Sequence, residues 1–167
     1  YFSNLEQHNI RTDALAFPWC VLFVLGNPQF FLFLIGCIYK IDGTFSQKIA
    51  MFRSLIRKAG IRRFLRRKRF CNILVLVDEG LFHSAHNCLC SPTQCANDED
   101  ISKFFRLCPV PDKLVVLNSS EETLLAHLAQ RGDLSPRIED EYHLVRFIRN
   151  ARLLFIKLGG LCLLKKI

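Results

Sequence analysis

The stretch that decides the predicted fold class is Asn72-Ile-Leu-Val-Leu-Val-Asp78-Glu79-Gly80. Residues 73–77 form a continuous apolar run of strand length, which ends in acidic residues and a glycine. Such a run is typical of a strand that is buried on both faces of a parallel sheet. A second short apolar run covers residues 114–117. We therefore expect two neighbouring parallel strands.

Helical segments alternate with these strands along the chain. Ser119 and Glu122 form a capping-box pattern, which predicts that a helix begins at residue 121. Strand and helix alternating with short joints indicate parallel pairing with right-handed crossovers, so we expect an α/β fold, a parallel sheet flanked by helices. The further predicted elements are a helix over residues 81–89, a polar loop over 90–100, helices over 121–130 and 137–158, and a last strand over 160–164.

The most apolar part of the chain lies earlier and consists of two runs, Ala16–Leu25 and Phe30–Tyr39. They are separated by Gly-Asn-Pro-Gln, in which Asn27 suits a helix N-cap and Pro28 the first helical position. We expect the second run to be a helix and the first to end a strand or pack as a buried turn. A spanning helix needs about 20 continuous apolar residues, which neither run reaches by itself. Membrane association through residues 16–39 stays open as the less favoured alternative.

A basic segment follows, with eight Lys or Arg residues between Arg57 and Arg69. Apolar residues recur at helical spacing over residues 46–70, which predicts one or two helices with a break or kink at Gly60. The basic residues suit either a solvated helix face or a nucleic-acid surface. We favour the solvated face and expect no nucleic-acid partner. The same residues would also suit the cytoplasmic flank of a membrane segment.

The composition indicates one intracellular domain. A chain of 167 residues, 50% of them hydrophobic, is long enough for one core and too apolar for a disordered protein. The net charge of +8 favours anionic partners, such as nucleotides, phosphorylated substrates or acidic membrane surfaces. Eight cysteines at irregular spacing, with no signal-peptide pattern at the start of the sequence, predict reduced thiols and a cytoplasmic location.

A group of His and Cys residues raises the question of a metal site. His83 and His86 are spaced for one helix face, and Cys88, Cys90 and Cys95 follow them. Such thiols could complete a tetrahedral zinc site. However, no Cys-x-x-Cys pair accompanies them, and scattered Cys and His residues are more often packed in a core. We expect packed residues and leave the zinc site open as an alternative.

Two groups of charged residues are candidates for phosphoryl-transfer chemistry. Asp78 ends the first predicted strand, and ligands of α/β sheets bind beyond the carboxyl ends of strands. A carboxylate in that place, with Glu79 beside it, would hold Mg²⁺. Arg131 and Arg137 flank a short loop and would neutralise phosphate charge if the loop closes over a nucleotide. The simpler alternatives are an acidic strand end and a basic helix end.

The order of these segments resembles the thymidylate kinases and related P-loop nucleoside and nucleotide kinases. In that family a strand of the pattern Pro-Asp-x-x-apolar-x-Leu is followed by a helix that ends in arginine, and then by a lid and a further helix. The matching segments, over roughly residues 70–158, are 75–80, 111–117, 119–132 and 137–149. The resemblance implies a P-loop NTPase fold, ATP and Mg²⁺ as cofactors, Asp78 as the metal ligand and Arg131 and Arg137 as lid arginines. It also implies a nucleotide and a small phosphoryl acceptor as partners.

Two departures from the family pattern bear on activity. The phosphate-binding loop, Gly-x-x-x-x-Gly-Lys-Ser/Thr, is absent from this sequence and would precede Tyr1 on that alignment. Glu79 and Gly80 stand where thymidylate kinases carry Asp-Arg, which puts thymidylate in doubt as the substrate. We interpret residues 1–167 as a single truncated kinase-like domain with an impaired ATP-dependent phosphotransferase function. The alternative is a non-catalytic basic protein that associates with membranes or nucleic acid.

We expect this chain to bind Mg-ATP poorly, because the backbone amides and the lysine of the phosphate-binding loop supply most contacts to the β- and γ-phosphates. Calorimetric titration of the purified protein with Mg-ATP measures this directly. Micromolar binding would show that the loop is not needed.

Overall fold

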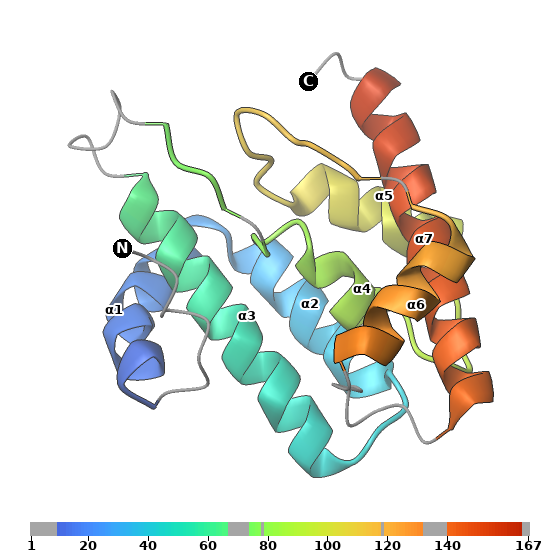
Figure 1. Ribbon diagram of the computed structural model, residues 1–167. Helices are drawn as coiled ribbons and strands as arrows, with labels where there is room; N and C mark the ends of the chain where they lie inside the picture. Colours follow the sequence, from blue (N-terminus) through green and yellow to red (C-terminus); the bar gives the residue numbers. More distant parts are fainter. Residues whose placement is uncertain (1–9, 67–73, 78, 118, 132–139, 165–167) are drawn as a thin grey trace.

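The computed structural model describes residues 10–66, 74–77, 79–117, 119–131 and 140–164. Within these ranges the chain is all-α, with seven helices and no strand (Figure 1). The predicted α/β fold with a parallel sheet is therefore wrong. The helices are α1 (Ile10–Gly26), α2 (Pro28–Lys40), α3 (Phe45–Leu65), α4 (Ser84–Leu89), α5 (Asp98–Leu107), α6 (Glu121–Arg131) and α7 (Glu141–Leu164).

The two predicted central strands are extended segments without a sheet. Residues 74–77 and 114–117 adopt neither helix nor strand. Leu76 and Leu117 are each 87% exposed. A buried strand needs hydrogen-bonded neighbours on its edges and a covering layer on each face, and neither segment has them in the described part of the chain. The apolar composition favours a strand but does not supply these neighbours.

Helix α7 takes the place of both the predicted helix over residues 137–158 and the predicted strand over 160–164, and it begins at Glu141. The strand prediction is wrong because the helical period continues past the two glycines. Leu154, Leu158 and Cys162, at four-residue intervals, are all buried against the core. A run of apolar residues this short does not distinguish strand from helix, and the buried neighbours decide it.

Local capping signals explain where other helices begin. Helix α2 begins at Pro28 as predicted, and α4 and α6 overlap the predicted helices. The side chain that caps α6 is Ser120 rather than Ser119, since its Oγ accepts from the Thr123 N–H at 3.2 Å. Helix α5 lies largely outside the predicted elements and begins in the predicted polar loop. Its first turn is acidic, and Asn97 Oδ1 accepts from the Asp100 N–H at 2.7 Å, which stabilises a helix N-terminus.

A chain of aromatic rings joins the helices in the core. The Phe30 ring lies 6.4 Å from that of Phe23 and 5.7 Å from that of Phe104, and Phe104 lies 5.8 Å from Phe82. All three contacts are edge-to-face, the arrangement that aromatic pairs prefer. They connect α1, α2, α5 and the turn before α4, so these elements share one core.

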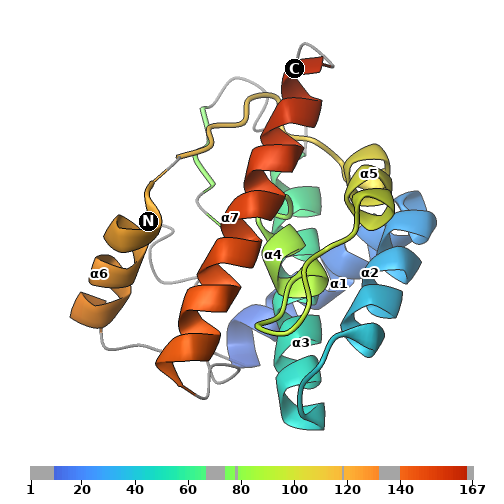
Figure 2. The same cartoon turned by 90° about the vertical axis from the view of Figure 1, so that its right-hand side faces the viewer.

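The carboxyl-terminal helices cover the other side of α4. Figure 2 shows α7 lying in front of α4, with α5 on one side and α6 on the other. Asn150 Nδ2 donates to the Ser91 carbonyl oxygen at 2.9 Å, which ties α7 to the segment after α4. Arg149 forms an ion pair with Glu121 at 3.2 Å, which ties α7 to α6. Helix α1 is at the opposite edge of the molecule (Figure 1).

Helix α1 packs almost entirely against α3, and the two run in the same direction. Asp13 lies beside Arg57, with 3.2 Å between Oδ1 and Nε, and the rings of Trp19 and Phe64 are 5.6 Å apart. Between these contacts, a Cβ built on Gly60 would lie 2.3 Å from the Ala16 carbonyl oxygen. The predicted helix break or kink at Gly60 is therefore wrong. Gly60 is the point of close approach between α1 and α3.

Gly60→Ala is expected to lower the free energy of unfolding by about 2 kcal/mol, because the new methyl group meets the backbone of α1 and forces the helices apart. This corresponds to a fall in melting temperature of roughly 4–8 °C in a chain of this size. The control is Gly159→Ala on α7, where nothing lies within 4 Å of an added Cβ. That control should be neutral or stabilising by up to about 1 kcal/mol. Equal melting temperatures for the two variants would contradict this account.

Candidate membrane-binding surface

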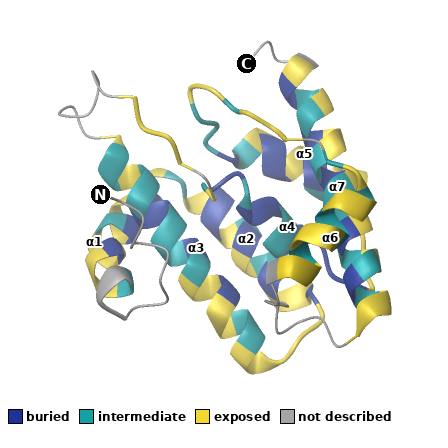
Figure 3. Cartoon of the chain, in the orientation of Figure 1, coloured by how far each residue is buried: buried dark blue, intermediate teal, exposed yellow. Residues whose placement is uncertain are grey.

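Helix α1 is apolar on every side but is covered on only one. From Ala14 to Gly26 it contains no charged residue. Its buried side chains, Ala16, Cys20 and Phe23, form one stripe at spacings of four and three residues. Figure 3 shows exposed residues along the rest of the helix. A helix that is apolar all round is normally buried in a large core or in lipid.

Exposed apolar side chains also occur on α2 and α3. Leu25, at the end of α1, is 74% exposed, and Leu15 near its start is 71% exposed. Such patches on a protein surface mark interaction sites. We call the whole set the α1–α3 apolar surface: Leu15, Phe17, Val21, Leu22 and Leu25 of α1, Leu32, Ile35 and Tyr39 of α2, and Phe45, Ile49 and Phe52 of α3.

A sharp corner joins α1 and α2. The two helix axes are bent by 110° at the break between Gly26 and Pro28. Asn27 lies outside both helices, and its Nδ2 donates to the Phe23 carbonyl oxygen at 3.0 Å, which satisfies an acceptor that α1 leaves open at its end. Among the described helices none is long and apolar enough to cross a membrane alone, and the bent α1–α2 pair reaches that length and composition only together.

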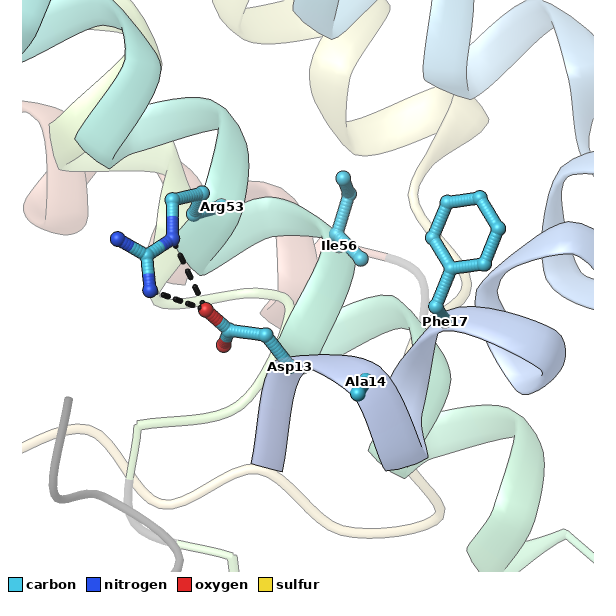
Figure 4. Close-up of a pocket in the computed structure, with 5 residues that line it drawn as sticks. All are labelled: Asp13, Ala14, Phe17, Arg53 and Ile56. Atoms are coloured by element: carbon cyan, nitrogen blue, oxygen red, sulfur yellow. Dashed lines mark hydrogen bonds and ion pairs between the residues drawn. The ribbon is translucent and has the colours of Figure 1, made fainter. Parts of the chain in front are cut away.

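A shallow pocket of about 310 Å³ marks the junction of α1 and α3. Figure 4 shows Phe17 and Ile56 pointing to the same side of the two helices. Asp13 accepts hydrogen bonds from Nε and Nη2 of Arg53 at the pocket edge. The pocket thus has an apolar wall and one carboxylate that is paired with arginine, which suits an interface more than a catalytic site.

The basic residues of α3 turn toward different elements. Arg53 and Arg57 pair with Asp13 of α1, and Lys58 Nζ lies 3.4 Å from a Glu79 carboxylate oxygen. Arg62 Nη2 donates to the Val110 carbonyl oxygen at 2.8 Å, and burial lowers the pKa of its guanidinium, with nearby Arg66 lowering it further. Within the predicted basic segment, Arg57, Lys58 and Arg62 therefore have internal contacts, whereas Arg63 and Arg66 are exposed as expected for a solvated face.

The predicted phosphoryl-transfer residues are not brought together by the described structure. Asp78 and Arg137 lie outside the described residues, and Arg131 ends α6 with its side chain not described. Glu79 is exposed and pairs with Lys58. The sheet edge that was to present Asp78 is missing from the described ranges. Their roles with ATP and Mg²⁺ stay predictions from the sequence.

His83, His86, Cys88 and Cys90 pack against neighbours as the sequence predicted, whereas Cys95 is exposed. The ring of His83 lies 4.4 Å from that of His86, and both lie within about 6 Å of Phe155. Cys88 and Cys90 are buried. In the part of the chain that the structure describes, no three His, Cys, Asp or Glu side chains are grouped to hold a metal ion.

The sequence contained the signal for this surface, but our interpretation missed it. The absence of any charge between Asp13 and Lys40 indicates a helix pair with apolar outer sides. We instead assigned the first apolar run to a strand end or a buried turn. No protein-family profile, curated protein or solved structure matches this chain.

Cysteine alkylation tests the packing behind this surface. Burial raises the pKa of the Cys108 thiol to about 12, so at pH 8 almost none of it is the reactive thiolate. Cys95 is exposed. We expect iodoacetamide to label Cys95 first and Cys108 only at much higher pH or after unfolding, as measured by peptide mass spectrometry. Rapid labelling of Cys108 in the folded protein would contradict the packing of α5.

Proposed function

We propose that this chain is a membrane-associated protein that binds one leaflet of an anionic lipid surface through the α1–α3 apolar surface. The observation that carries the proposal is α1, a charge-free helix with one buried stripe and apolar side chains on its remaining sides. Lipid provides an apolar environment for those sides without requiring a second protein.

The shape of the α1–α2 pair favours a position in the interface. Helix α1 has 17 residues and is about 25 Å long, shorter than the roughly 20 apolar residues that a spanning helix needs. The bend of 110° directs α2 away from the line of α1. Because Phe23 and Phe30 hold this corner from the core side, α1 can enter lipid without leaving α3.

The energies are adequate for reversible binding. Fully burying a large apolar side chain contributes about 1.5–3 kcal/mol, so five half-exposed side chains on α1 contribute roughly 5 kcal/mol. The net charge of +8 adds attraction to anionic lipid, at about 1 kcal/mol for each cation near the surface. Together these effects resemble a single acyl anchor assisted by basic residues.

Leu25→Glu is expected to weaken binding to vesicles that mix phosphatidylcholine and phosphatidylserine by about tenfold or more, since a charge would enter the apolar interface. Vesicle sedimentation measures the bound fraction. Leu163→Glu is the matched control, because Leu163 is also strongly exposed but lies on α7. The control should bind like the unchanged protein. Equal losses in both variants, or no binding by the unchanged protein, would refute the proposal.

Binding should also fall as salt rises, because counterions screen the attraction between a chain of net charge +8 and anionic lipid. Vesicles of phosphatidylcholine alone separate the two contributions. We expect weak, salt-independent binding to them. Strong binding to neutral vesicles at all salt concentrations would show that charge has no part in it.

A further inference from the structure

A second depression lies between α2 and α5 and is separate from the pocket at α1. It has a volume of about 630 Å³ and is open to solvent. The helices run antiparallel beside it, since Phe33 of α2 lies near Lys103 and Phe30 near Phe104. We call it the α2–α5 groove. Its lining residues are Gln29, Leu32, Phe33, Gly36, Cys37 and Lys40 of α2, and Asp100, Lys103, Arg106 and Leu107 of α5.

The groove combines an apolar floor with an excess of positive charge. Lys40, Lys103 and Arg106 line it with a single carboxylate, that of Asp100. Asp100 is already engaged at the start of α5, where it accepts from Asn97 Nδ2 at 3.0 Å. Among the ion pairs found in the described residues, none involves the three cations. The groove is therefore electrostatically suited to an anion.

Lys103 lies over an apolar residue of the groove, with its Nζ 5.3 Å from the centroid of the Phe33 ring. Burial raises the pKa of the Cys37 thiol to about 11, with Asp100 raising it further and Lys40 and Lys103 lowering it.

Gly36 keeps the groove open. A Cβ built on it would meet nothing within 4 Å, so the missing side chain leaves space rather than permitting a close helix contact. Leu32 lines the groove and is also one of the exposed residues of the α1–α3 apolar surface.

We infer that the α2–α5 groove binds one anionic phospholipid, with its phosphate between Lys103 and the neighbouring cations and its acyl chain over Leu32, Phe33 and Gly36. The inference rests on the proposed membrane association, which it deepens by giving the surface a preference for lipid headgroup charge. A free phosphate would leave the apolar floor of the groove uncovered, and an acyl chain without a phosphate would leave its cations unpaired.

The test uses lipids that remain monomeric in solution, so that it does not depend on vesicle binding. Dihexanoyl phosphatidylserine, dihexanoyl phosphatidylcholine and inorganic phosphate are each titrated into the full chain below the micelle concentration, with calorimetry and the amide resonance of Gly36 as readouts. We expect the serine lipid to bind at least about tenfold more tightly than the choline lipid, and phosphate to produce no shift at Gly36.

Two pairs of variants locate the site. Gly36→Leu fills the groove, and Gly160→Leu adds the same side chain on α7, where nothing lies within 4 Å. Lys103→Glu reverses a groove charge, and Lys113→Glu makes the same change at an exposed residue outside it. We expect Gly36→Leu and Lys103→Glu to weaken binding of the serine lipid by about tenfold or more, and both controls to leave it unchanged.

The outcomes distinguish this inference from the proposed function. Vesicle binding that depends on Leu25, without binding of monomeric lipid, would overturn the groove and leave the surface. Monomer binding that the groove variants abolish, without vesicle binding, would overturn the surface and leave the groove. Phosphate binding that Lys103→Glu abolishes, with no preference for lipid, would show an anion site and overturn the lipid assignment.

Discussion

The close contact between Gly60 and Ala16 is the constraint on which the arrangement of α1 depends. Because Gly60 has no side chain, the backbone of α1 approaches α3 closely. The single buried stripe of α1 then packs against α3. The Asp13 ion pairs and the Trp19–Phe64 ring contact lie on either side of this point. The helix is thereby fixed at the edge of the molecule, and its remaining apolar sides stay outside the core. The exposed apolar sides of α1 therefore depend on the close contact at Gly60.

The aromatic chain through the core has the complementary effect on α2. Phe30 contacts both Phe23 and Phe104, so the corner between α1 and α2 is packed from inside. The same packing sets α2 beside α5, where Lys103 and Phe33 meet. The α2–α5 groove lies where these two helices meet, and Leu32 of its lining is also one of the exposed apolar residues of α2.

Two helix starts that local chemistry specifies were located by sequence reasoning. Pro28 begins α2 as predicted, and the capping signal before residue 121 placed α6 although Ser120 rather than Ser119 provides the cap. The same kind of signal at Asn97 was present but was obscured by the polar composition that follows it. Gly60 was misread because glycine weakens a helix locally, whereas its role here is a contact with a helix more than forty residues earlier in the chain.

The two short apolar runs show why the fold class could not be decided in this way. Residues 74–77 and 114–117 have strand composition, and a sheet would require neighbouring strands that the described chain does not provide. The α1–α3 apolar surface was open to inference, since every residue of α1 beyond Asp13 is uncharged. The α2–α5 groove was not, because its cations come from two helices about sixty residues apart in sequence.

The sequence by itself determined that the first forty residues contain two uncharged apolar runs with a helix start at Pro28 between them, because hydropathy and proline geometry are local properties. Only the tertiary structure decided which side of that segment is covered. Burial depends on the distance between helices, and that distance is set by a contact between Gly60 and the Ala16 backbone that no local pattern contains.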